Sequence, residues 1–301
     1  MALSVFIEGR YISPKEAQVS VFDAGFIYSD VVYDVTSVWK GWFFKLDEHL
    51  DRFEVSCKGF RLSNPYDQDA MKRILARCVK AGNWDDAYIK VECTRGVIPN
   101  RSRDLREAEN TFMGYALPYI WIWGEETCRN GANLHVAQTV RRVPDTSIDA
   151  RYKNYNRGDF TKGKFEAYDH GCDDVIMIGT SGEVTEGSGY NVLVVKDGTV
   201  ATADSNVLEG VTRQAVLELC SDLGIPYELR RVEEHELADA DEVIATTTAG
   251  GVMPVIALSG KPVGDGKPGS LTVKLQEEYW DRRARGWHGT KVDDLLAGSA
   301  G

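Results

Sequence analysis

The sequence predicts an α/β protein made of two domains. Segments with strand-like alternation and segments with apolar residues three or four positions apart follow one another along both halves of the chain. The 301 residues are 43% hydrophobic and 27% charged, which is enough for two sizeable cores. A polar, proline-containing stretch at 140–150 shows neither period, so it is predicted to connect domain 1–139 to domain 151–301.

The first half is predicted to hold both strands and helices. Asp47 is the expected cap of one helix, and a second helix is expected to begin near Asp67 and to stop at Gly82, because their apolar residues recur at helical spacing. The strands and hairpins are expected over residues 5–12, 42–46, 87–94 and 112–122.

The second half repeats this alternation. A helix is predicted to run through Phe165, another to be capped by Thr212 and to end at Gly224, and a last one to span 271–285. The Gly/Ser-rich tail after Leu296 is expected to be disordered. The strands are expected over residues 174–178, 191–195, 200–202 and 241–248.

Composition narrows the class of protein. A formal charge of −11 and a pI near 5.0, without a basic block, argue against a nucleic-acid or anionic-membrane partner. We expect neither a signal peptide nor a membrane span, because there is no basic leader and no long uncharged apolar run. Six cysteines without a C-x-x-C pair fit reduced thiols in the cytoplasm, and five histidines without paired spacing predict no metal site.

Lys153 is the first candidate for chemistry, because it lies among aromatic and amide residues in the stretch 151–156. Partial desolvation makes an amine nucleophilic enough to form a Schiff base with an aldehyde. Taken alone, a solvated surface lysine is the commoner outcome.

A carboxylate in a glycine-punctuated turn is the second candidate. Glu186 lies in the turn predicted over 182–191, between strands. A carboxylate placed against the pyridine nitrogen of pyridoxal 5′-phosphate (PLP) keeps that nitrogen protonated, which makes the ring a better electron sink. The alternative is a plain turn with an exposed glutamate.

Two segments have the character of phosphate-binding cups. Residues 210–213 open a helix, where backbone N–H groups and the Thr212 hydroxyl can hold an anion at the positive end of the helix dipole. Residues 246–251 end a strand in small residues, which leaves N–H groups open to a phosphate. Either segment alone also fits an ordinary helix start or strand end.

Two other segments superficially resemble functional motifs but are predicted to have structural roles only. The stretch 264–270 lacks the spacing of a phosphate-binding loop and has a proline where a helix should begin, so it is predicted to be a surface turn. The aromatic run 119–123 alternates on a predicted strand and is expected to pack in a core or domain interface.

The order of the motifs resembles that of the fold-type IV PLP-dependent enzymes, the branched-chain/D-amino-acid aminotransferase fold. The resemblance extends from about Phe6 to Trp280. The segments that carry it are 22–26, 46–53, Lys153, 185–191, 210–213 and 247–249.

The resemblance implies roles for individual residues. Lys153 is implied to be catalytic, as the Schiff-base lysine that also carries the proton, and Glu186 is implied to pair with the pyridine nitrogen. It also implies two α/β domains with PLP between them, in a homodimer whose partner subunit helps to close the site. The phosphate is implied to be held by Arg52, Val211, Thr212, Thr247 and Thr248.

Within the family, segments 29–35, 140–144 and 247–251 are similar to those of the (R)-selective amine transaminases. This implies ping-pong transfer of an amino group from an (R)-amine to a 2-keto acid such as pyruvate. Arg101 is implied to lie on a mobile loop and to meet the carboxylate of the keto acid. The substrate-binding residues implied are Tyr28, Tyr33, Val35, Tyr88, Lys90, Arg101, Arg157 and Ala249.

Three positions depart from that subgroup. Tyr28 stands where a histidine is usual, Lys90 where an acidic or small residue is, and Arg157 where a tryptophan is. Two added cations near the pocket would favour an anionic substrate, whereas solvent-facing or interface charges would have no such effect.

Other functions of the same fold stay open. One is a D-amino-acid or branched-chain aminotransferase, although the latter usually have Thr-Ala-Ala-Glu at positions 248–251. Another is a PLP lyase such as aminodeoxychorismate lyase, against which segment 29–35 argues. A third is a degenerate domain that only binds, which the joint presence of Lys153, Glu186 and Arg52 opposes.

Overall fold

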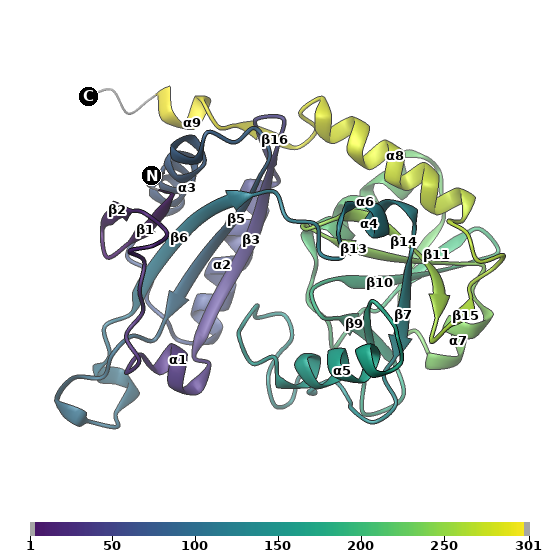
Figure 1. Cartoon of the computed structure of the whole chain (residues 1–301), viewed down its shortest axis with the longest axis horizontal. Coiled ribbons are helices and arrows are strands. Elements are labelled where there is room, and N and C mark those ends of the chain that lie inside the picture. The colour runs from purple at the N-terminus through teal and green to yellow at the C-terminus, as the bar shows by residue number, and fades with distance from the viewer. Residues whose placement is uncertain (1–3, 298–301) are drawn as a thin grey trace. The chain divides into compact units, whose positions relative to one another are not determined.

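The protein is described by a computed structural model that covers residues 4–297, except for the side chain of Arg101. The described chain divides into two compact units, which are taken separately below (Figure 1). Unit 1 contains residues 4–120, 152–156 and 283–297, and unit 2 contains residues 121–151 and 157–282.

This division differs from the predicted boundaries. The predicted connection at 140–150 lies inside unit 2, where Val140 joins an apolar cluster and the Arg142 guanidinium pairs with Asp159 at 2.7 Å. Residues 152–156 and 283–297, which were predicted to belong to the second domain, are part of unit 1. Arg142 is thus buried in an ion pair of unit 2, whereas Arg141, Asp145, Thr146 and Ser147 are exposed.

Unit 1 is built on a seven-stranded sheet with the order β16-β4-β3-β5-β6-β1-β2. All of its pairings are antiparallel, and β3 and β5 pair along eight residues, from Val31↔Thr94 to Val38↔Ala87. The strands are β1 Val5–Ile7, β2 Arg10–Ile12, β3 Val31–Trp39, β4 Trp42–Phe44, β5 Ala87–Thr94, β6 Thr111–Pro118 and β16 Gly289–Lys291.

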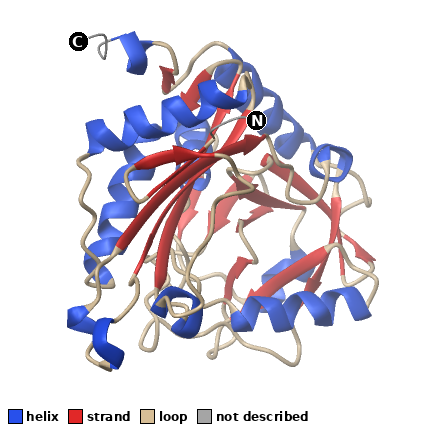
Figure 2. Ribbon diagram, turned by 60° about the vertical axis from the view of Figure 1, so that its left-hand side comes forward, coloured by secondary structure: helices blue, strands red, loops and turns tan. Residues whose placement is uncertain are grey.

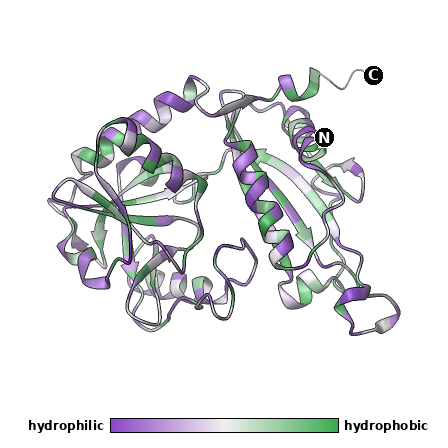
Figure 3. Cartoon of the chain, turned by 180° about the vertical axis from the view of Figure 1, so that it is seen from behind, coloured by the Kyte–Doolittle hydropathy of each residue, from purple (hydrophilic) through white to green (hydrophobic). Residues whose placement is uncertain are grey.

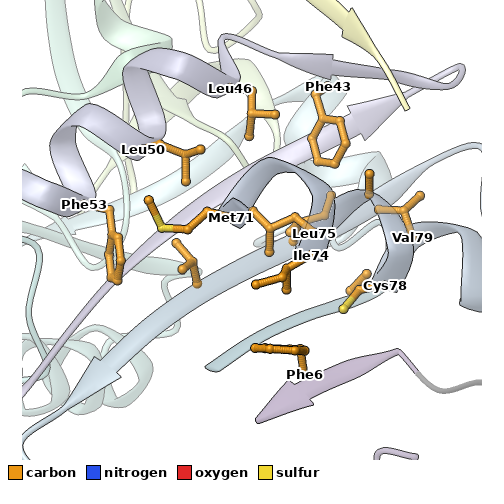
Figure 4. Close-up of a cluster of buried hydrophobic side chains, with 14 of the residues drawn as sticks. Phe6, Phe43, Leu46, Leu50, Phe53, Met71, Ile74, Leu75, Cys78 and Val79 are labelled. Carbon is orange, nitrogen blue, oxygen red and sulfur yellow. The ribbon is translucent and has the colours of Figure 1, made fainter. Parts of the chain in front are cut away.

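Helices cover one face of this sheet. Alternate strand residues such as Val32, Ile89 and Phe112 are buried against helices α2 and α3, and Figure 4 shows Leu50 and Met71 among the labelled side chains of this core. The opposite face of the sheet therefore carries the other set of alternating residues. The helical elements of unit 1 are α1 Ala24–Tyr28, α2 Leu46–Gly59, α3 Gln68–Gly82, η1 Pro99–Arg101, η2 Leu105–Glu107 and α9 Asp294–Ala297.

Unit 2 is built on a nine-stranded sheet in which six strands form a ring. The path β10-β13-β14-β7-β8-β9 closes because β9 also pairs with β10, and β11, β12 and β15 extend it. The pairs β7–β8, β7–β14 and β11–β12 are parallel. The strands are β7 Ala132–Val136, β8 Asp174–Ile178, β9 Val184–Gly187, β10 Asn191–Lys196, β11 Thr199–Thr202, β12 Tyr227–Leu229, β13 Glu242–Thr247, β14 Gly251–Leu258 and β15 Lys261–Pro262.

The core of unit 2 consists of apolar residues on its strands, such as Leu134, Ile176 and Val243. In each unit the strands lie beside packed helices (Figure 2). The helices alternate hydrophilic and hydrophobic segments, as expected for elements with one buried side (Figure 3). The helices of unit 2 are α4 Glu125–Asn130, α5 Gly158–Asp169, α6 Val211–Asp222 and α7 Glu234–Asp239; α8 Ser270–Ala284 enters unit 1 with its last two residues.

Several predicted elements have the predicted bounds. Strands β5 and β8 match, and the Asp67 side chain caps α3 by accepting from Ala70 N at 2.7 Å. Strands β10 and β11 are joined by a two-residue turn at Asp197 and Gly198, which both have the positive φ that such a turn requires.

Four local predictions are wrong. Helix α2 begins at Leu46 with Lys45 as its cap, so Asp47 lies in the first turn, and α6 is capped by Gly210 rather than Thr212. Glu186 lies within β9 rather than in a turn. The strand predicted over 112–122 ends at Pro118, because proline has no N–H to continue the ladder.

The aromatic run after β6 packs as expected although its strand has ended. Trp121, Ile122 and Trp123 lie against the core of unit 2. The predicted surface turn at 264–270 is confirmed as a turn with positive φ at Gly264 and Gly266. Ala297 ends α9, and the rest of the tail predicted to be disordered, residues 298–301, lies outside the described residues.

Across residues 4–297, no helix combines the length and the apolar character needed to cross a bilayer. No cluster of three or more His, Cys, Asp or Glu side chains suited to a metal ion is present in the same range. All six cysteines are reduced and buried.

A buried carboxylate holds residues 138–139, just before the 140–150 stretch, in place. Glu166 on α5 accepts hydrogen bonds from the Thr139 hydroxyl at 2.6 Å and from Gln138 N at 2.6 Å, and it contacts His135 Nε2 at 3.0 Å. Burial raises the pKa of Glu166, but these hydrogen bonds outweigh it and lower the pKa to about 2.

We expect Glu166→Gln to lower the free energy of unfolding at pH 7 by up to about 3 kcal/mol. Because the folded pKa lies below the unfolded value, this stabilisation is present above pH 4.5 and is lost as the pH falls towards 2. Urea unfolding at pH 7, 5.5 and 4 measures the difference, with the exposed Glu126→Gln as the control. A difference that does not shrink at pH 4 would contradict the assignment.

Candidate active site

Lys153 extends the edge of the unit 1 sheet. Residues 152–156 run beside the first part of β3, with the bridge Val32↔Asn154 and a hydrogen bond from Tyr33 N to Lys153 O at 3.0 Å. Lys153 N donates to Ser56 Oγ on α2 at 3.0 Å, which anchors the segment from the other side. Lys153 is half-buried, in keeping with the partly desolvated amine predicted from the sequence.

The sheet register places Lys153 on the face that α2 and α3 leave free, which we call the lysine face. Tyr33 lies opposite Lys153, and the Lys153 Nζ is 4.8 Å from the centroid of the Tyr33 ring. The same alternation brings further residues of unit 1 to this face. They are Val35 on β3, Tyr88, Lys90 and Glu92 on β5, Tyr115 on β6, and Tyr155 beside Lys153.

Three side chains on the lysine face form a polar cluster. The Lys90 Nζ is 2.6 Å from the Glu92 Oε1, and the Tyr155 hydroxyl accepts from Lys90 and donates to Glu92. Burial raises the pKa of Tyr155, and so does the Glu92 carboxylate, so the phenol stays protonated. The charge on Lys90 is thus compensated within unit 1.

Arg52 is held by a buried carboxylate on the helix-covered side of the sheet. Asp34 accepts from Arg52 Nε at 2.8 Å and Nη2 at 2.9 Å, and its Oδ1 is 2.7 Å from His49 Nδ1. Burial raises the pKa of Asp34, but the Arg52 guanidinium and His49 outweigh it and hold the pKa well below its usual range. Burial lowers the pKa of His49. This network fixes the direction of the guanidinium.

The remaining predicted residues of unit 1 are placed as follows. Tyr28 ends α1 and is 59% exposed. Arg101 ends η1, a short helix where no regular element was expected, and its side chain lies outside the described residues. Arg103 and Arg106 are two further arginines of this loop that the sequence offers for the same role, and Arg106 is paired with Asp104 at 2.5 Å.

In unit 2, the strand register aligns three polar residues in one row. Glu186 on β9 is paired with Asn191 on β10, and Asn191 is paired with Thr246 on β13. Glu186 accepts from Leu208 N at 3.1 Å, and Asn191 Nδ2 donates to Leu208 O at 2.8 Å. The row therefore lies against the loop that leads into α6.

Glu186 is kept charged by a buried arginine. It is 6% exposed, and its Oε1 is 3.3 Å from the Arg142 Nη2, while Arg142 also pairs with Asp159. A glutamate in contact with a guanidinium favours its ionised form. The alternative of an exposed turn glutamate is therefore wrong.

The start of α6 has the features of an anion cup. Gly210 precedes Val211 and Thr212 with no side-chain cap, and a Cβ at Gly210 would come within 1.9 Å of Asn191 Oδ1. The Thr246 hydroxyl next to Asn191 is buried without a hydrogen-bond partner. N–H groups at a helix start and an unpaired hydroxyl suit a phosphate, so this part of unit 2 fits the phosphorylated cofactor.

The strand end at 247–249 and Arg157 complete the predicted set. Thr247 Oγ1 donates to Gly189 O at 2.7 Å, Ala249 O accepts from Ile122 N at 2.8 Å, and Thr248 is half-buried between them. Arg157 donates to Ser188 O at 2.5 Å and its guanidinium carbon lies 4.9 Å from the centre of the Phe160 ring.

The structure also identifies residues to which the sequence alone gave no role. Asp34 and Glu92 are acidic residues inside apolar strands, and a buried carboxylate needs a partner. That was the available signal for both. The bond of Glu92 to Tyr155, and the ion pairs of Arg142, join residues far apart in the sequence.

Comparison with known proteins agrees with this arrangement. The model of the family "Amino-transferase class IV" matches residues 31–258, and the chain belongs to this family. A D-alanine aminotransferase of Staphylococcus haemolyticus is 32% identical over 279 residues, which is 91% of this chain and 96% of the relative.

Solved structures are similar over almost the whole chain. A branched-chain amino acid aminotransferase (T.th.) in complex with N-(5′-phosphopyridoxyl)-L-glutamate has a TM-score of 0.88 and 27% identity, covering 97% of this chain and 99% of its own. The branched-chain aminotransferase of Thermoproteus uzoniensis with norvaline has a TM-score of 0.88 and 28% identity, covering 96% and 99%. The predicted fold is confirmed, the protein is a class IV aminotransferase, and its cofactor is PLP.

Proposed function

We propose that the protein transfers an amino group from an (R)-amine to a 2-keto acid such as pyruvate, in two half-reactions that share one site. The observation that carries this proposal is the surroundings of Lys153 on the lysine face. Tyr33 and Val35 give it an aromatic and aliphatic surface, which suits an apolar amine. The similarity of segment 29–35 to the (R)-selective amine transaminases supports the same donor.

The residues of each unit have separate tasks in this proposal. Lys153 binds the cofactor covalently and moves the proton at the substrate carbon, as a lysine held on a rigid strand edge can do. Glu186, charged through Arg142, holds the proton on the ring nitrogen. When bound, PLP supplies the electron sink for charge at the substrate carbon.

The phosphate group is assigned to donors of three kinds. The start of α6 offers the N–H groups of Val211 and Thr212, and the strand end offers Thr247 and Thr248. Arg52 supplies the positive charge, and Asp34 and His49 keep its guanidinium in one orientation. A fixed guanidinium loses less entropy on binding a phosphate.

Amino acids are the second candidate donors. The similarity to a D-alanine aminotransferase and to branched-chain aminotransferases favours D-alanine or branched-chain amino acids in that role. We further propose a cytoplasmic homodimer whose partner subunit helps to close the site, in keeping with an acidic chain that has reduced, buried cysteines.

The donor can be decided directly. Purified protein with PLP is incubated with pyruvate and (R)-1-phenylethylamine, and alanine is measured; D-alanine or L-leucine with 2-oxoglutarate is tested in parallel. Faster turnover of the (R)-amine than of its (S)-enantiomer and of both amino acids supports the proposal. Turnover of amino acids alone would establish the second candidate, and release of pyruvate from aminodeoxychorismate would indicate a lyase.

We expect Arg101→Ala to slow the keto-acid half-reaction about 10- to 150-fold in kcat/KM and to spare the amine half-reaction. The reason is the loss of a charge-assisted contact with the keto-acid carboxylate. The cofactor spectrum follows each half-reaction separately, and Arg106→Ala is the control, because Arg106 is held by Asp104. Equal slowing of both half-reactions would place carboxylate recognition elsewhere.

A further inference from the structure

We propose that Glu92 determines substrate specificity: by compensating Lys90 on the lysine face, it excludes substrates whose side chain carries a second carboxylate. The inference rests on the proposed function only in requiring an amino donor and a keto acid. It concerns the group attached to the reacting carbon, whereas the proposed function concerns the choice of amino donor.

The Lys90–Glu92 pair is almost completely withdrawn from water. Its side chains are 15% and 8% exposed, its charged atoms are 2.6 Å apart, and Tyr155 bonds to both. A buried pair of this kind is strongly destabilised when one partner loses the other, because the remaining charge has neither water nor a counter-ion. The pair therefore behaves as one neutral unit.

Lys90 of this pair and Lys153 both contact the same aromatic ring, that of Tyr33. The Lys90 Nζ is 4.6 Å from the centroid of the Tyr33 ring, and the Lys153 Nζ is 4.8 Å from the same centroid. Tyr155 packs against Tyr33 with its centroid 5.0 Å away. A substrate that reacts at Lys153 has its substituents next to this ring, and hence next to the Lys90–Glu92 pair.

The charges decide which substituents this surface accepts. An uncharged side chain meets two aromatic rings and a neutral ion pair. A second carboxylate meets no net positive charge at Lys90, because Glu92 already neutralises the ammonium, and it lies beside a buried carboxylate of the same sign. Of the two interpretations of Lys90 that the sequence left open, a preference for anionic substrates is disfavoured once Glu92 is paired with it.

The test uses three variants of the holoenzyme. Glu92→Gln keeps the shape of the side chain and removes its charge, Lys90→Met removes the cation, and the double variant Lys90→Met/Glu92→Gln removes both. For each, kcat/KM is measured with 2-oxoglutarate and with pyruvate, using whichever amine or amino acid the wild type accepts. The ratio of the two values reports discrimination against the second carboxylate.

We expect Glu92→Gln to raise the 2-oxoglutarate/pyruvate ratio about tenfold or more, because an uncompensated ammonium attracts a carboxylate. Lys90→Met should not raise the ratio, since it leaves Glu92 as the only charge of the pair. The double variant should return to within about threefold of wild type. A Glu92→Gln ratio within twofold of wild type, or a double variant with the same rise as Glu92→Gln, would overturn the proposal.

A binding measurement needs no turnover. Calorimetry compares glutarate with butyrate, which differ by one carboxylate, and Glu92→Gln should bind glutarate about tenfold more tightly while butyrate is unchanged. If Glu92→Gln does not fold, the double variant Lys90→Met/Glu92→Gln decides: glutarate binding within about threefold of wild type would support the proposal, because the wild-type pair already offers no net charge, and binding weaker by about tenfold or more would refute it, because Lys90 would then attract the second carboxylate in the wild type. Neither readout depends on an (R)-amine, so the proposed function can fail without affecting this result.

Discussion

Replacing Lys153 with alanine is expected to reduce turnover by about a thousandfold or more and to abolish the covalent attachment of PLP. Lys153 is the half-buried lysine whose strand pairs with β3 and whose Nζ lies over Tyr33. Borohydride reduction followed by peptide mapping should place the pyridoxyl group on Lys153 in the wild type and on no lysine in the variant.

Lys162→Ala is the matched control, because Lys162 is an exposed lysine on α5 and should keep full activity. Lys90 is the other lysine of the lysine face, and its tie to Glu92 makes it unavailable as a nucleophile. A pyridoxyl group mapped to Lys90 would therefore contradict both the assignment of Lys153 and the cluster described for Lys90.

Glu186→Gln is expected to leave PLP bound and to slow proton transfer at the substrate carbon about a hundredfold. Glutamine can keep the hydrogen bond from Leu208 N, so the loop before α6 should stay in place. It cannot supply the negative charge that holds a proton on the ring nitrogen. Stopped-flow measurement of each half-reaction gives the rate.

The control for this variant is Glu183→Gln, three positions earlier and outside the row formed by Glu186, Asn191 and Thr246. It should react at the wild-type rate. If Glu186→Gln remains within twofold of wild type, the carboxylate has a structural task, such as binding Arg142, and the charge on the ring nitrogen is controlled in another way.

Local periodicity was sufficient for much of the fold. Helix α3 has the predicted bounds because its buried residues recur at helical spacing, and strand β8 because it is a short, continuously apolar run of the kind typical of a fully buried strand; strand β5 also has the predicted bounds. Helix caps were less predictable, since several polar residues stand near each start. The caps observed, Lys45 and Gly210, make no side-chain hydrogen bond to the backbone N–H groups of the helix, so the capping chemistry of Ser, Thr, Asp or Asn did not mark them.

Candidate site residues could be named from the sequence where one motif carries one implied role. Lys153, Glu186 and the start of α6 were singled out by residue type and order, and each lies in a suitable local setting. Pairing between distant segments was not predictable. Lys90 and Glu92 are two residues apart on β5, but Tyr155, which bonds to both, is brought to them by the pairing of residues 152–156 with β3.

The discontinuity of unit 1 has a consequence for protein synthesis. The edge strand β16 and helix α9 come from residues 289–297, and Lys153 comes from a segment inserted into the sequence of unit 2. On the ribosome, all residues of unit 2 have been translated before β16 can pair with β4. Unit 1 begins translation first but completes its sheet last. Termination before Gly289 would remove β16 and leave one edge of β4 unpaired. A truncated nascent chain should therefore expose that edge to chaperones and proteases.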